Sequence, residues 1–93
     1  MEPRFSFGEA LAMMRDGIRV TRAGWNGKGL WLELQAPDEH SKMTLPYIYI
    51  NYPDDAKTAP GARVPWSPSQ TDMLSYDWME FTGDSPQAQP PAA

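Results

Sequence analysis

The sequence contains no cysteine and a single histidine among its 93 residues. Without cysteine, neither disulfide bonds nor thiolate metal sites can form, and the composition suits a reducing cytosol. No apolar run approaches the roughly 20 residues that a membrane-spanning helix requires, and the first residues lack the apolar stretch of a signal peptide. We therefore expect a cytoplasmic protein that has no membrane partner, no metal site and no cofactor.

Basic residues are also scarce, because eight Lys and Arg are outnumbered by twelve Asp and Glu, giving a net charge of −4. A general coat for DNA or RNA requires a basic field, so a polymeric nucleic acid is not an expected partner. The length suits one small domain with a small core, and self-association would add buried area. We predict one domain over residues 1–82 that forms a homo-oligomer, followed by a disordered tail over residues 83–93 that has no core-forming residue.

Hydrophobic periodicity predicts an α+β fold. Ser6 and Glu9 form a capping box, and the following apolar residues recur at helical spacing, which predicts a helix over residues 7–16. Alternation of apolar and polar residues predicts strands over residues 18–22, 30–35, 47–52 and 77–81. We predict an N-terminal helix packed on a small, mostly antiparallel sheet of four or five strands, with a short helix near the C-terminal end.

The strand predicted over residues 30–35 places its leucines on one face and Trp31 on the other. The leucine face is expected against the first helix. Trp31 is then either half-exposed or buried by a partner subunit, and the second of these is preferred. Tyr47 and Tyr49 share a face of a later strand, which a neighbouring subunit could close or which could serve as a stacking platform.

The segment 65–78 is the richest in chemical groups, with two tryptophans, a tyrosine, several hydroxyls and two carboxylates. Ser69 and Asp72 resemble a capping box, which predicts a short helix. Its free N–H groups, with the side chains of Ser69 and Thr71, could bind an anion or a polar ligand. The alternative interpretation is a capped turn whose tryptophans fill a small core.

A glycine-rich turn is predicted over residues 23–29, and it contains Trp25. A bulky ring in a polar turn has little of its own chain to pack on, and glycine allows another molecule to approach the backbone. A ligand site is one interpretation. An ordinary hairpin loop with Trp25 folded back on the core is the other.

Enzyme motifs are missing: the sequence has no P-loop, no H-E-x-x-H, no G-x-S-x-G and no Cys/His/Asp cluster. Asp72 and Asp77 could form a carboxylate pair, but the sequence does not define their separation. What remains suits binding: tryptophans that stack on planar rings, amides and hydroxyls, and Arg19, Arg22 or Lys28 to meet phosphate. An acidic protein with localised basic groups fits a compact nucleotide better than a polymer.

Three motifs carry a family resemblance over about residues 5–81. They are Phe7-Gly8-Glu9-Ala10-Leu11, Gly17-x-x-Val20-x-Arg22-x-Gly24-Trp25-Asn26-Gly27-Lys28-Gly29 and Pro65-Trp66-x-x-Ser69-Gln70-Thr71-Asp72-Met73-Leu74-x-x-Asp77-Trp78. This combination resembles the second Thoeris anti-defence family of phage proteins. The resemblance implies a sponge rather than an enzyme, one that sequesters cyclic ADP-ribose isomers, above all 1′′–3′ glycocyclic ADP-ribose, inside the infected bacterial cell. It also implies homotetramers with pockets between subunits and, for some members, cyclic dinucleotides at a separate site.

The same resemblance assigns roles to residues. Trp25 and Trp66 would stack on the adenine, polar side chains would read base and ribose hydroxyls, and Arg22, Lys28 or backbone N–H groups would hold the pyrophosphate. The predicted ligand-binding set is Arg22, Trp25, Asn26, Gly27, Lys28, Trp66, Ser69, Gln70, Thr71 and Asp72, with no catalytic residue. Two alternatives stay open: a nucleotide hydrolase that uses Asp72 or Asp77, and a structural phage protein whose aromatic residues only make oligomer contacts.

Overall fold

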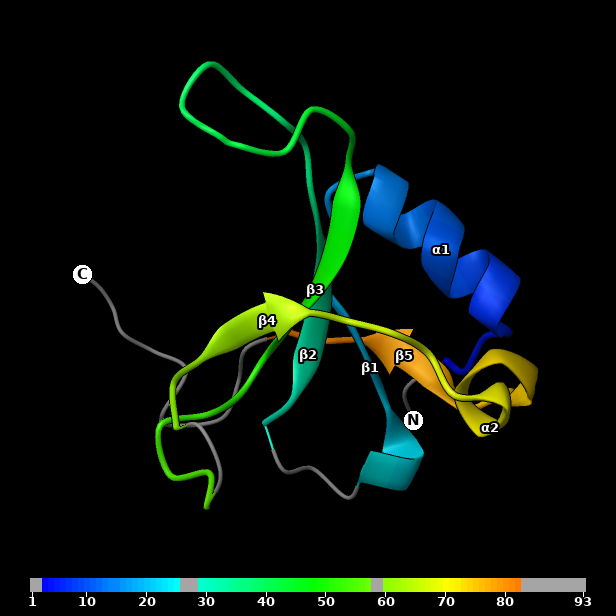
Figure 1. The fold of residues 1–93 in the computed structure, drawn as a ribbon. Helices are drawn as coiled ribbons and strands as arrows, with labels where there is room; N and C mark the ends of the chain where they lie inside the picture. The colour runs from blue at the N-terminus through cyan, green and yellow to red at the C-terminus, as the bar shows by residue number, and fades with distance from the viewer. Residues whose placement is uncertain (1–2, 26–28, 58–59, 83–93) are drawn as a thin grey trace.

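The computed structural model describes residues 3–25, 29–57 and 60–82. In chain order the elements are α1 (Phe7–Arg15), β1 (Val20–Arg22), a 3₁₀ turn η1 (Ala23–Trp25), β2 (Trp31–Gln35), β3 (Tyr47–Asn51), β4 (Arg63–Pro65), α2 (Gln70–Leu74) and β5 (Trp78–Glu80). The predicted α+β class is confirmed, with one N-terminal helix, one sheet and one short late helix (Figure 1). None of the helices described is long and apolar enough to cross a membrane. The predicted tail over residues 83–93 lies outside the described residues.

The sheet has five strands in the order β4-β3-β2-β1-β5, and every neighbouring pair is antiparallel. β5 therefore returns from the end of the chain to pair with β1, where Arg22 lies opposite Trp78. The sequence did not single out β4 as a strand. It is only three residues long, it is exposed, and it contains Pro65, a residue that an edge strand tolerates because one of its sides needs no N–H donor.

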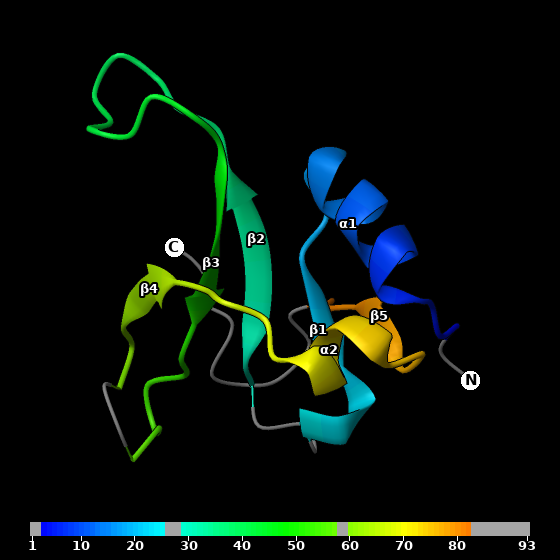
Figure 2. The same cartoon turned by 45° about the vertical axis from the view of Figure 1, so that its right-hand side comes forward.

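Helix α1 forms where the capping box predicts. The Ser6 hydroxyl accepts the Glu9 N–H, and the Glu9 carboxylate accepts the Ser6 N–H in return. The helix ends before Gly17, whose φ of 86° is a left-handed conformation that glycine adopts without strain. α1 lies across one face of the sheet, in contact with β1, β2 and β5 (Figures 1 and 2). Its inner face buries Ala10 and Met14.

The core lies between α1 and the sheet, and Trp78 is its largest buried side chain. Val20, Leu32 and Ile50 complete the sheet side of this core. The ring of Phe7 packs on Trp78 with centroids 5.3 Å apart. One tryptophan of the segment 65–78 is thus a core residue, as the alternative interpretation of that segment expected.

The expectation for Trp31 was wrong. Its side chain does lie on the face opposite α1, but it is only 7% exposed within a single chain. Phe81 stacks on it at 5.9 Å, and the guanidinium carbon of Arg19 lies 4.7 Å from its ring centroid. Side chains from before β1 and after β5 thus bury Trp31 without a partner subunit.

Candidate functional site

Arg22, the last residue of β1, joins the two segments that the sequence analysis singled out. Its Nη1 atom lies 2.8 Å from Asp72 Oδ1, and its Nε atom lies 2.9 Å from Asp77 Oδ1. The three side chains are largely shielded from solvent, and that of Arg22 is 13% exposed. Figure 2 shows the consequence, since α2 is held next to the η1 turn that follows β1. We call Arg22, Asp72 and Asp77 the arginine clamp.

Gly24 in the η1 turn packs directly on the arginine clamp. Its backbone N–H donates to Asp77 Oδ2 at 2.8 Å. A Cβ atom at this position would lie 3.0 Å from both Arg22 Nη2 and Asp77 Oδ2, which is shorter than an ordinary van der Waals contact. At Gly24, therefore, the close approach that glycine allows is made by side chains of the same chain.

The clamp fixes the charge of its carboxylates. The hydrogen bond from Arg22 holds the pKa of Asp77 below its usual value and outweighs burial, and the Gly24 N–H adds to this effect. Burial acts to raise the pKa of Asp72, but hydrogen bonds from Ser69 and Arg22 outweigh it, so this pKa is also lowered. The pKa of Arg22 is raised, chiefly by its hydrogen bond to Asp77 and against the effect of burial. At neutral pH both carboxylates are ionised and paired with Arg22. Neither is therefore suited to act as a general acid or a general base in catalysis.

Helix α2 begins at the predicted capping box. Ser69 Oγ accepts the Asp72 N–H at 3.1 Å, and Asp72 Oδ2 accepts both the N–H and the hydroxyl of Ser69, at 3.1 and 2.9 Å. A carboxylate of the protein itself thus occupies the helix N-terminus, where an external anion would meet like charge. The side chains of Gln70 and Thr71 are exposed beside it and can meet a polar ligand.

Trp25 and Trp66 are half-buried and both pack against Trp78. Their ring centroids lie 5.5 and 6.1 Å from that of Trp78, in edge-to-face orientations. Trp25 therefore folds back on the core, as the hairpin interpretation expected, although part of its surface stays accessible. The Trp78 indole N–H donates to the Asp72 backbone oxygen at 3.0 Å, which connects this aromatic cluster to α2.

The structure thus brings together seven of the ten predicted binding residues around Trp78 and α2. They are Arg22, Trp25, Trp66, Ser69, Gln70, Thr71 and Asp72. Asn26, Gly27 and Lys28 lie outside the described residues. The prediction missed the structural role of Asp77, which was considered only as a possible acid or base. Its position at the start of the strand predicted over residues 77–81 gave no sign that it pairs with Arg22.

Acidic and histidine side chains do not gather into a metal site in the part of the chain that the structure describes. His40 is exposed, and its nearest charged partner is the adjacent Glu39, at 3.4 Å.

Comparison with known proteins places these motifs in a family. Residues 5–81 match the family model described as the Thoeris anti-defense 2-like domain. The chain is also 41% identical over 85 residues to a protein of Bacillus phage SP01 named Thoeris anti-defense 2, in an alignment that covers 84% of this chain and 96% of the relative.

Proposed function

Because this chain belongs to the Thoeris anti-defense 2-like family, we propose that it blocks Thoeris immunity by binding and sequestering a cyclic ADP-ribose signalling nucleotide. The proposed ligand is 1′′–3′ glycocyclic ADP-ribose, and cyclic dinucleotides form a second ligand class. The signal is held intact in the cytoplasm of the infected bacterial cell, and the protein works as a homotetramer. The observation that carries the proposal is the pair of half-buried tryptophans, Trp25 and Trp66, which lie around Trp78 beside the capped helix α2.

The chemistry of the residues supports this choice of ligand. The accessible parts of Trp25 and Trp66 can stack on the adenine, where each stacked ring contributes about 1–3 kcal/mol. Gln70 and Thr71 can donate or accept hydrogen bonds with base edges and ribose hydroxyls, and the ionised Asp72 can accept hydrogen bonds from ribose hydroxyls.

The arginine clamp changes which groups are expected to contact the pyrophosphate. Two carboxylates already neutralise Arg22, so its main contribution is to hold the η1 turn and α2 in place. The pyrophosphate contact then falls to Lys28 and to backbone N–H groups of the glycine-rich turn.

A hydrolase is disfavoured by the same clamp. Asp72 and Asp77, the two carboxylates that a hydrolase would use, have lowered pKa values and are paired with Arg22. Incubating the protein with 1′′–3′ glycocyclic ADP-ribose and then denaturing it with heat separates the three functions. A sponge releases intact ligand, a hydrolase releases product, and a structural protein retains none before heating.

The site itself is tested by Trp25→Ala and Trp66→Ala. Each is expected to weaken binding by about five- to 150-fold in calorimetry, which corresponds to about 1–3 kcal/mol. Because both rings pack on Trp78, some loss of stability is also expected, so the phenylalanine variants are measured in parallel. They preserve an aromatic ring and should recover part of the affinity.

Tyr76→Ala provides the matched control, since it removes an aromatic ring that is 78% exposed near α2. It should leave both affinity and stability unchanged. Folded alanine variants of Trp25 and Trp66 that bind with wild-type affinity would place the stacking site elsewhere.

A further inference from the structure

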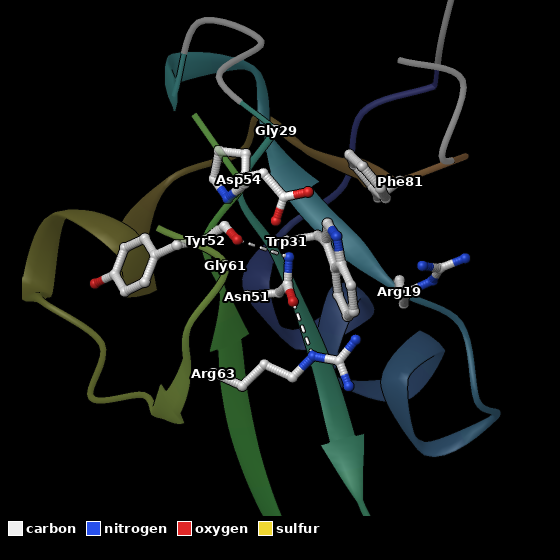
Figure 3. Close-up of a pocket in the computed structure, with 10 residues that line it drawn as sticks. Arg19, Gly29, Trp31, Asn51, Tyr52, Asp54, Gly61, Arg63 and Phe81 are labelled. Carbon is white, nitrogen blue, oxygen red and sulfur yellow. Dashed lines mark hydrogen bonds between the residues drawn. The ribbon is translucent and has the colours of Figure 1, made fainter. Parts of the chain in front are cut away.

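A second candidate site lies on the face of the sheet opposite α1. There a cavity of about 250 Å³ opens between the strand ends and the segment that precedes β4 (Figure 3). Its lining includes Arg19, Trp31, Arg63 and Phe81, together with the backbone at Gly29 and Gly61. Apart from Gly29, which ends the glycine-rich turn, none of these residues belongs to the site around Trp78. The proposed function assigns no role to the others.

Two arginines share one aromatic ring in this cavity. The guanidinium carbon of Arg19 lies 4.7 Å from the ring centroid of Trp31, and that of Arg63 lies 5.8 Å from the same centroid. The two cations can therefore be no further apart than the sum of these distances. Among the described residues, no carboxylate lies within ion-pair distance of either guanidinium.

The contacts of Arg63 hold it in position without neutralising it. Its Nε atom donates to Asn51 Oδ1 at 2.9 Å, as the dashed line in Figure 3 shows, which leaves its terminal nitrogens available. The nearby Glu33 carboxylate accepts the Tyr49 hydroxyl at 2.6 Å. Burial and this bond raise the pKa of Tyr49 to about 12, so the phenol stays neutral beside Arg63. Asp54 also lines the cavity, and Figure 3 shows it on the opposite side of Asn51 from Arg63.

From this arrangement we infer that the cavity binds a small phosphorylated ligand through its phosphate group. Guanidinium groups match phosphate oxygens in geometry and charge, and one phosphate offers enough oxygens for two arginines approaching from different directions. In a protein with a net charge of −4, such a site depends on local cations.

The cavity also limits what the rest of the ligand can be. Its aromatic floor, Trp31, is covered by Phe81 and by the arginines, so no base can stack there. Its volume lies just below the roughly 300–1,000 Å³ of sites for drug-sized ligands. A sugar phosphate or pyrophosphate fits these limits, and the site is separate from the nucleotide site proposed above.

Inorganic pyrophosphate is the probe for the test. Titration into the full-length protein at low salt, followed by NMR, should shift the backbone amide signal of Gly61, which lines this cavity alone. Arg19→Gln and Arg63→Gln should each weaken binding by about tenfold, because each removes one charge-assisted contact. Added salt should weaken binding further, since the charges are partly exposed.

Arg15→Gln is the matched control, because it makes the same change of charge at an exposed position in the last turn of α1, on the other face of the sheet. It should bind pyrophosphate like the wild type. If one of the two cavity variants loses its fold, as judged by circular dichroism, the other still decides the matter.

Three results would overturn the inference: no saturable binding of pyrophosphate, equal affinity in the wild type and both cavity variants, or shifts confined to the residues around Trp78. A fourth would be a change of oligomeric state in the cavity variants without any phosphate binding, since the arginines would then meet carboxylates of a second copy. Calorimetry with 1′′–3′ glycocyclic ADP-ribose keeps the two sites distinguishable. Loss of pyrophosphate binding alone would count against the cavity, and loss of 1′′–3′ glycocyclic ADP-ribose binding alone would count against the proposed function.

Discussion

Arg22 shows how much of this protein depends on contacts between residues that are distant in sequence. It is the last residue of β1, yet its two partners lie 50 and 55 residues further along the chain. Arg22 holds α2 next to β1 through its bond to Asp72. The indole N–H of Trp78 also donates to the Asp72 backbone oxygen and fixes the same helix. The position of α2 beside the aromatic cluster around Trp78 therefore depends on the Arg22 cation and the buried Trp78 ring.

Arg22→Gln should destabilise the protein because it leaves Asp72 and Asp77 shielded from solvent without their cation. Fully buried pairs cost about 3–5 kcal/mol when one partner is removed, and surface pairs cost about 0–1 kcal/mol. The partial exposure of this clamp places the expected loss near 2 kcal/mol in urea denaturation. Arg15→Gln, at an exposed position, should change the free energy of unfolding by less than about 0.5 kcal/mol. Equal stability of the two variants would show that the clamp does not stabilise the fold.

The clamp also predicts how stability depends on pH. The pKa values of Asp72 and Asp77 are lower in the folded state than the roughly 3.9 of an unfolded Asp. Above that value both states are ionised, and the stabilisation is fully present. As the pH falls from about 4 through the folded-state pKa values, the unfolded chain binds protons first, so the free energy of unfolding decreases.

Asp77→Asn is the variant that tests this dependence. It should be less stable than the wild type at pH 7 and should lose less stability between pH 5 and pH 2, as measured by urea midpoints across that range. Parallel curves for the wild type and the variant would assign the acid sensitivity to other carboxylates.

Among the elements, those defined by local interactions could be predicted from the sequence. Both capping boxes involve residues three apart, so the starts of α1 and α2 were predicted correctly. β4 was missed because its three exposed residues have no pattern of their own and are ordered by pairing with β3. The burial of Trp31 was missed for a similar reason, because Arg19 and Phe81 cover it only once β1 and β5 are neighbours. For the candidate site, the sequence singled out the segments that Arg22 joins but not the ion pairs between them.

Ser69→Ala should act on α2 alone. The cap contributes about 1 kcal/mol, and α2 is short and exposed and has no buried residue, so the helix should open locally while the core stays folded. Hydrogen exchange should therefore be about fivefold faster at the Asp72 amide, with little change in the global free energy of unfolding. Ser67→Ala, at an exposed position outside the cap, is the control and should leave this amide unchanged. Unchanged exchange at Asp72 in Ser69→Ala would show that the arginine clamp alone holds the helix.

For the whole molecule, exposed apolar side chains and not Trp31 are the reason to expect self-association. Trp31 was one motive for the predicted oligomer, but it is buried within a single chain. The apolar surface that remains lies elsewhere: Leu45, in the loop before β3, is 74% exposed, and Leu74, at the end of α2, is 73% exposed. Figure 1 shows the loop between β2 and β3 extending away from the sheet, far from α2. Two separate apolar surfaces suit an assembly in which each chain meets more than one neighbour.

The predicted homotetramer can be tested on this basis. Light scattering at micromolar concentration should give a mass about four times the 10.5 kDa of one chain. Leu45→Glu or Leu74→Glu should reduce that mass to a dimer or a monomer, because each places a charge in an apolar contact, and neither should unfold the chain, since both side chains are exposed. Ser67→Glu adds the same charge at an exposed polar position and should leave the mass unchanged. A folded wild-type monomer at these concentrations would rule out the tetramer, and ligand pockets formed between subunits would be ruled out with it.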